Sequence, residues 1–235
     1  VDDRSDYDID EDREKLSVLP KQDETADEAN PTGKVDGYNY NIIHLDCGRK
    51  YFSVDSIKQI IDNASAAGFN YIQLAVGNDG MRFLLDDMSL EVNGTTYDGT
   101  AITAAIKAAN KAYYDAGTHN ELTQSEMDEI IAYAYTKGMG VIPLINTPGH
   151  MDAILAAANK ATGVNCAYYS TTAYKYSERT IDVKNATATG FTKAFLKKYI
   201  TYFAGKGCKL FNMGADEYAN DTGSPRFSEL QNGTG

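Results

Sequence analysis

Short apolar runs alternate with longer amphipathic stretches from about residue 40 onward, a pattern typical of strand–helix units in series. Four of the apolar runs have the length of a buried strand. They are residues 41–46, 69–76, 140–145 and 209–213. We therefore expect four strands joined through helices, and hence an α/β fold.

Apolar residues three and four positions apart predict an amphipathic helix between successive strands. The first connection shows this spacing at Ile57, Ile60, Ile61 and Ala64. Ser53 can cap the start of that helix, and Gly68 can end it. Before the third strand, Thr123 and Glu126 have the spacing of a capping box, with Gly138 as the stop. The last connection aligns Phe195, Tyr199 and Phe203 on one helical face.

The connection after the second strand is longer than one helix requires. Residues 82–92 alternate toward a hairpin that closes at Asn93 and Gly94, and residues 102–113 have helical spacing. We expect an inserted hairpin and an inserted helix here. After the third strand, we expect a short Ala-rich helix following His150 and then an irregular Tyr-rich stretch.

Four such units fit either an open doubly wound sheet or a barrel. The two glycine-rich phosphate-binding fingerprints are absent from the sequence, which removes the usual support for a nucleotide-binding sheet. In barrels, the active site forms where the carboxyl ends of the strands meet. Polar residues follow all four strands: Asp46 and Arg49, then Asn78, Asp79 and Arg82, then Asn146 and His150, then Asp216 and Glu217. We therefore predict a (β/α)₈ TIM-barrel type, represented by strands 1–4.

Negative charge is concentrated at the start of the chain. Residues 1–36 carry 13 acidic and 5 basic side chains, and residues 37–235 carry 20 and 17, so most of the net charge of −11 lies in the leading segment. Because that segment is poor in apolar residues, we predict an acidic disordered linker. It contains a calcium-loop spacing at Asp6, Asp8, Asp10 and Asp12. Glu11 and Ser17 stand where such a loop needs Gly and Glu, which favours a solvated tail instead.

Several function classes are disfavoured by composition. No basic patch is present to replace the counterions of a nucleic acid. Cys47, Cys166 and Cys208 are odd in number and widely spaced, so we expect buried thiols rather than disulfides or a metal site. No two histidines have ligand spacing, and we expect neither a metal nor a cofactor. No apolar run approaches the roughly 20 residues of a membrane span, so we expect no membrane insertion.

The sharpest chemical feature is the Asp216–Glu217 pair directly after a strand. Two neighbouring carboxyl groups whose environments differ can supply one proton donor and one anion, which acetal hydrolysis requires. Arg49 fits two roles, a bidentate ligand for a polar substrate or a structural ion pair with Asp46 or Asp216. His150 is either a hydrogen-bonded orienting group or a satisfied buried histidine.

Four segments, in order and at the expected strand ends, resemble the first half of the catalytic domain of glycoside hydrolase family 20, the β-N-acetylhexosaminidases. The similarity is strongest to the exo-acting modules of Gram-positive surface proteins. The segments are HLDCGRKYF at 44–52, GNDGMRF at 77–83, VIPLINTPGHMD at 141–152 and FNMGADEY at 211–218. The resemblance covers residues 41–220 and makes residues 37–235 the N-terminal half of such a domain.

The resemblance implies hydrolysis of terminal non-reducing β-linked N-acetylhexosamine from glycans. The sugar's own acetamido oxygen would act as the nucleophile and form an oxazolinium intermediate, so the mechanism is substrate-assisted and retaining. Glu217 matches the general acid and base, Asp216 the partner of the acetamido N–H, and His150 the histidine behind the acid. The positions that match substrate-binding residues are Arg49, Asp79, Asn78 and Tyr218.

The sequence departs from the common family pattern at three places. Asn146 stands where many members carry Asp, residues 77–79 replace a paired-acid segment, and Ala215 replaces a Gly. Two alternatives therefore stay open: a non-catalytic glycan-binding fragment, and a lacto-N-biosidase-type relative that releases a disaccharide.

The resemblance also bears on what surrounds this segment. It implies an extracellular or wall-attached protein, and it implies that the remaining half of the barrel follows Gly235. The sequence holds 17 Tyr and 8 Phe but no Trp. Because resembling members carry pocket-lining Trp on later strands, the same expectation explains this imbalance.

Overall fold

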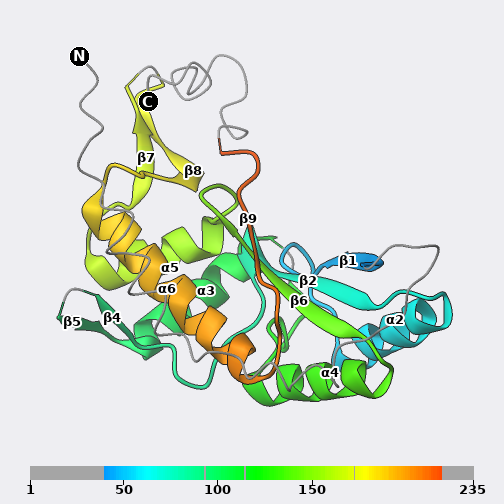
Figure 1. Cartoon of the computed structure of the whole chain (residues 1–235). Helices are drawn as coiled ribbons and strands as arrows, with labels where there is room; N and C mark the ends of the chain where they lie inside the picture. The colour runs from blue at the N-terminus through cyan, green and yellow to red at the C-terminus, as the bar shows by residue number, and fades with distance from the viewer. Residues whose placement is uncertain (1–39, 93, 114, 172, 219–235) are drawn as a thin grey trace, which may run out of the picture. The chain divides into compact units, whose positions relative to one another are not determined.

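The computed structural model describes residues 40–92, 94–113, 115–171 and 173–218 (Figure 1). The predicted acidic linker over residues 1–36, with its calcium-like spacing, lies outside the described residues. Among those described, no helix combines the length and the apolar character that a membrane crossing needs.

Four parallel strands form the central sheet in the order in which they occur in the chain (Figure 1). They are β1 (Ile42–Asp46), β2 (Tyr71–Asn78), β6 (Gly140–Thr147) and β9 (Asn212–Gly214). All eight residues of β6 are buried, as expected for a parallel strand covered on both faces. This order agrees with the first half of a barrel, although the described strands form an open sheet.

The fourth strand begins later than the sequence predicts. Residues 209–211 lie outside β9, and only Asn212 and Gly214 pair in register with β6. Leu210 and Met213 are both exposed. The apolar run is therefore an edge segment rather than the buried strand that its composition indicated.

Three long helices follow the predicted connections: α2 (Val54–Ala66), α4 (Gln124–Thr136) and α6 (Ala186–Gly205). The predicted caps are confirmed. The Ser53 side chain accepts from the backbone N–H of Ser56, and Thr123 with Glu126 forms a reciprocal capping box. The Tyr133 hydroxyl donates to the Asp62 carboxylate at 2.8 Å, which joins α4 to α2, and Figure 1 shows the two helices side by side.

The insertion after β2 contains the predicted hairpin and helix. Strand β3 (Gly80–Met81) turns back on β2, β4 (Leu90–Val92) pairs with β5 (Thr95–Tyr97), and α3 (Gly99–Tyr113) follows. The hairpin is shorter than predicted because residues 82–89 do not form a strand.

Arg82, which the sequence placed among the polar strand-end residues, is buried. Its guanidinium donates to three backbone carbonyls, those of Gly48, Asn110 and Asn120. Arg82 therefore holds the inserted segment against the strand ends.

The prediction of an irregular Tyr-rich stretch is wrong. The segment after α5 (Asp152–Thr162) forms an antiparallel hairpin of β7 (Ala167–Ser170) and β8 (Lys175–Ile181). Buried and exposed positions alternate in the first half of β8, as in a strand with one face covered, and its pairing with β7 shifts register before Ile181. Because tyrosines occupy both faces of the hairpin, the apolar residues of this segment do not show the two-residue period that predicts a strand.

The core joins the sheet to the outer helices. Phe83, from the insertion, packs against Tyr199, Tyr202 and Phe203 of α6 with ring centroids 5.2–5.6 Å apart. All three cysteines are free and buried, as expected. Burial raises the pKa of the Cys208 thiol to about 11, which keeps it protonated.

Candidate active site

The carboxyl ends of the four parallel strands lie along one edge of the sheet and bring distant residues together. Asp46 ends β1, Asp79 follows β2, His150 follows β6 and Glu217 follows β9. Figure 1 shows these strands side by side. Six of the seven predicted site residues are joined here by hydrogen bonds: Glu217, Asp216, His150, Asp79, Asn78 and Arg49.

The first chain of contacts runs through His150. Its Nδ1 lies 2.7 Å from Asp79 Oδ1, and its Nε2 lies 2.8 Å from Glu217 Oε2. The side chains of His150 and Asp79 are each 2% exposed, whereas that of Glu217 is 50% exposed. A buried Asp–His pair thus backs a carboxyl group that faces outward.

Arg49 extends this chain on the other side of Asp79. Its Nε donates to Asp79 Oδ2 at 2.7 Å, and its Nη1 lies 3.3 Å from Asp46 Oδ2. Of the two ion-pair partners considered from the sequence, Asp46 is present, and Asp79 is an additional partner. Because 47% of the Arg49 side chain is exposed, the ion pair leaves part of the guanidinium edge facing outward.

A second chain of contacts supports Asp216. Asn146 Nδ2 donates to Asp216 Oδ1 at 2.7 Å and lies 3.3 Å from Asn78 Oδ1. Asn78 Nδ2 in turn donates to Asp46 Oδ2 at 2.9 Å. Asn146 is buried. The sequence showed Asn146 and Asp46 as strand-end polar residues but did not assign either one to the site, although strand-end position was the signal.

Unusual backbone conformations gather at this edge. Asp79, His150, Ala215 and Glu217 have φ between 51° and 64°, a region that residues other than glycine rarely occupy. Gly214 also has a positive φ, and a Cβ there would overlap Asn146 Oδ1. Such strain persists only where the surroundings enforce it, and it clusters at functional sites.

Asp152 is the first residue of α5 and follows His150 by two positions. Burial and the neighbouring negative charge of Asp79 raise the pKa of Asp152 to about 6. The positive charge of Arg179, whose Nε lies 3.9 Å from Asp152 Oδ1, lowers this pKa by a smaller amount. Asp152 Oδ1 is buried and has no hydrogen-bond partner among the described residues.

Tyr218, the seventh predicted site residue, is directed elsewhere by its contacts. Its hydroxyl donates to the Ile181 carbonyl at 3.1 Å, and its own carbonyl accepts from Thr180 Oγ1 at 2.9 Å. Tyr218 therefore fastens the end of β9 to β8. Its substrate-binding role stays a prediction.

One geometric feature is compatible with a metal. Ligand atoms of His150, Asp216 and Glu217 lie within 4.8 Å of one another. Both ring nitrogens of His150 contact carboxylates, and Asp216 Oδ1 accepts from Asn146, so hydrogen bonding already accounts for this spacing. The expectation of no metal stays a prediction.

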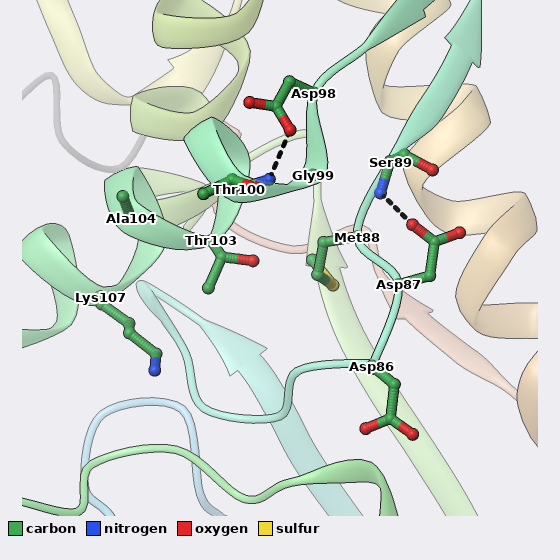
Figure 2. Close-up of a pocket in the computed structure, with 10 residues that line it drawn as sticks. All are labelled: Asp86, Asp87, Met88, Ser89, Asp98, Gly99, Thr100, Thr103, Ala104 and Lys107. Atoms are coloured by element: carbon green, nitrogen blue, oxygen red, sulfur yellow. Dashed lines mark hydrogen bonds between the residues drawn. The ribbon is translucent and has the colours of Figure 1, made fainter.

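A separate pocket of about 530 Å³ shares no residue with this site (Figure 2). It is lined by Asp86, Asp87, Met88, Ser89, Asp98, Gly99, Thr100, Thr103, Ala104 and Lys107. Asp98 accepts from the backbone N–H of Thr100, and Asp87 accepts from that of Ser89 and from Lys198 Nζ. These contacts explain the two carboxylates structurally, and we assign the pocket no function.

Residues 38–230 match the catalytic domain of glycosyl hydrolase family 20, which is more than half of the chain. The chain belongs to glycosyl hydrolase family 20. The predicted family is thereby confirmed, and with it membership in a family of glycoside hydrolases.

Comparison with solved structures and curated proteins agrees with this assignment. A structure of a catalytic module of the pneumococcal exo-β-D-N-acetylglucosaminidase StrH is 46% identical, with a TM-score of 0.75 over 82% of this chain. A lacto-N-biosidase of Bifidobacterium bifidum is 26% identical over 68% of this chain, and a β-hexosaminidase of Vibrio furnissii is 26% identical over 51%. The chain spans 46% of the solved pneumococcal chain, 13% of the lacto-N-biosidase and 19% of the β-hexosaminidase.

Proposed function

We propose that the protein containing this chain hydrolyses terminal non-reducing β-linked N-acetylhexosamine from glycans by substrate-assisted, retaining catalysis. Family membership and the 46% identity to a pneumococcal exo-β-D-N-acetylglucosaminidase module support the substrate class. The observation that carries the proposal is the outward-facing Glu217, backed by His150 and Asp79, with Asp216 beside it.

Glu217 is the proposed general acid and base. When His150 carries its proton on Nδ1, it donates to Asp79, and Nε2 is left to accept from a protonated Glu217. Glu217 gives that proton to the glycosidic oxygen as the bond to the anomeric carbon breaks. The resulting carboxylate then takes a proton from the water that opens the intermediate, which restores the acid.

Asp216 is the proposed partner of the substrate's acetamido group. Asn146 holds Asp216 Oδ1, which leaves Oδ2 to accept from the acetamido N–H. This contact would direct the acetamido oxygen at the anomeric carbon and stabilise the positive charge that develops on the oxazolinium ring. The reaction gains from fixed geometry, since the nucleophile is part of the substrate.

The proposed binding roles differ between exposed and buried residues. The half-exposed Arg49 guanidinium would hold the hydroxyls of the terminal sugar. Asp79 and Asn78 are buried, so we assign them positioning roles through Arg49, His150 and Asn146 rather than direct contact with substrate.

We further propose that the four strands are the first half of a (β/α)₈ barrel in an extracellular or wall-attached protein. Their sequential parallel order supports the barrel, as does the 46% coverage of the pneumococcal chain. The expected glycan substrate and the resemblance to modules of Gram-positive surface proteins support the extracellular or wall-attached location.

One alternative has a specific observation in its favour. The similarity to a lacto-N-biosidase leaves open release of a disaccharide rather than a monosaccharide. Chromogenic glycosides of N-acetylglucosamine and of lacto-N-biose, assayed side by side on the intact gene product, separate the two. We expect the monosaccharide glycoside to be the better substrate.

The main test of the proposal is the Glu217→Gln variant of the intact gene product. We expect its kcat on a chromogenic N-acetyl-β-glucosaminide to fall by about 10² to 10⁴, the usual contribution of a general acid. Glu129→Gln, on the outer helix α4, is the matched control and should retain the wild-type rate. Equal rates for Glu217→Gln and the wild type would remove the role given to Glu217.

A further inference from the structure

The β7–β8 hairpin is attached to both loops that carry the proposed acid and its histidine. The backbone N–H of Met151 donates to the Arg179 carbonyl at 2.9 Å, and that of Ile181 donates to the Pro148 carbonyl at 3.1 Å. Thr180 Oγ1 and the Ile181 carbonyl both contact Tyr218, the residue after Glu217. Figure 1 shows the hairpin extending beyond the end of α5, next to the end of β9.

Two tyrosines on this hairpin pack against each other instead of into the core. Tyr169 and Tyr176 are opposite each other in register, with ring centroids 4.9 Å apart and an interplanar angle of 62°. They are 41% and 46% exposed. An exposed pair of large aromatic rings beside a catalytic edge is a typical feature of a binding surface.

Burial along β8 gives the direction in which this pair faces. Tyr176 and Glu178 are exposed on either side of the buried Ser177, so both lie on the outward face of the strand. The pairing with β7 then shifts register, and the buried Thr180 holds the carbonyl of Tyr218.

The length of chain between Tyr176 and Thr180 limits how far the tyrosine pair lies from Glu217. Tyr176 precedes Thr180 by four positions, and four positions of extended chain span at most about 14 Å, so Tyr176 lies within about that distance of the anchor next to Glu217. An oligosaccharide can cover that length. An exo-acting site encloses the terminal sugar, so the part of a glycan that extends past Glu217 is the leaving-group side.

We propose that Tyr169 and Tyr176, with Glu178, form an outer subsite that binds the leaving-group portion of the glycan; this inference rests on the proposed function. The face of an aromatic ring is electronegative and attracts the C–H groups of a sugar ring. The tyrosine hydroxyls can donate to and accept from sugar hydroxyls, and the exposed Glu178 carboxylate can accept from them. This mixture of ring faces and polar groups suits a sugar better than an apolar protein surface.

The kinetic test compares two substrates of the intact gene product. One is a chromogenic N-acetyl-β-glucosaminide without a sugar leaving group, and the other is an oligosaccharide in which N-acetylglucosamine is followed by at least three sugars. For the Tyr169→Ala, Tyr176→Ala double variant, we expect kcat/KM on the oligosaccharide to fall about tenfold, mainly through KM, as for the loss of aromatic contacts. On the chromogenic substrate, kcat/KM should stay within about twofold of the wild-type value.

Two controls separate contact from folding. Tyr40→Ala removes another exposed tyrosine, beside the start of β1 and thus at the opposite end of the sheet, and should leave both substrates unaffected. The Tyr169→Phe, Tyr176→Phe variant keeps both rings and should retain most of the oligosaccharide rate. Equal losses on both substrates, or no loss on the oligosaccharide, would overturn the subsite.

A binding measurement keeps this result distinct from the proposed function. Calorimetry of the same oligosaccharide with the Glu217→Gln form, with and without the tyrosine substitutions, reports the subsite even if the wild type cleaves neither substrate. We expect the alanine pair to weaken oligosaccharide binding about tenfold and to leave free N-acetylglucosamine binding unchanged. Unchanged oligosaccharide binding would contradict the subsite, whereas absent cleavage with weakened binding would contradict only the hydrolase.

Discussion

At the residue scale, the site depends on one buried amide. Asn146 is the only described hydrogen-bond partner of Asp216 Oδ1, and it also contacts Asn78. Many family members are expected to carry Asp at this position, which would place one carboxylate against another. An amide supplies a donor instead, so it can fix Asp216 while leaving it an acceptor for the substrate.

We predict that Asn146→Leu, which removes the donor at similar size, lowers kcat by about tenfold to a hundredfold, as for the loss of a hydrogen bond to a charged group. KM should change by less than about threefold, because Asp216 acts on charge that develops in the transition state. Steady-state kinetics on the chromogenic substrate measure both values. A rise in KM with unchanged kcat would show that Asn146 contributes to ground-state binding only.

Residue positions at strand ends were predictable, but their pairing was not. The sequence placed Asp79, His150 and Glu217 after different strands, and parallel order brings such ends together. Which carboxylate contacts which ring nitrogen depends on the left-handed turns at these residues, and no local pattern indicates a left-handed Glu or His. Arg82 shows the reverse case, since its strand-end position indicated a site residue and its carbonyl contacts make it structural.

At the element scale, helices were more predictable than strands. The caps of α2 and α4 depend on side chains within a few residues of each helix start, so the sequence carries them locally. The β7–β8 hairpin depends on contacts with Pro148, Met151 and Tyr218, which are distant in sequence. Its composition therefore did not reveal it.

The start of α5 gives a prediction about pH. The folded state raises the pKa of Asp152 from 3.8 to about 6, so it binds this proton more tightly than the unfolded chain does. Stability from this group is therefore greatest below pH 4 and is lost as the pH rises to about 6, with a total of up to about 3 kcal/mol. Asp152→Asn removes the titration, so its free energy of unfolding relative to wild type should improve between pH 4 and pH 7.

Urea unfolding at several pH values measures this difference. Asp55→Asn, in the first turn of α2, where the carboxylate is exposed, is the matched control for loss of a charge near a helix start. A difference between Asp152→Asn and wild type that does not change with pH would contradict the raised pKa.

At the scale of the whole molecule, the order of the sheet was predictable because each strand–helix unit places its strand beside the preceding one. The short, exposed fourth strand was not, because its apolar run resembles a buried strand. The described strands leave Asp216 and Glu217 exposed at the β9 edge. The chain also spans 46% of the solved pneumococcal chain, so activity measurements call for the intact gene product.

The substrate's acetamido oxygen, directed by Asp216, is the proposed nucleophile. Chromogenic glycosides whose N-acetyl group carries zero, one, two or three fluorines test it most directly, because each fluorine makes that oxygen less nucleophilic while the leaving group stays the same. For the wild-type intact gene product, we predict that kcat/KM falls steadily with each added fluorine. A rate that is independent of fluorination would contradict acetamido participation and would require a nucleophile from the protein.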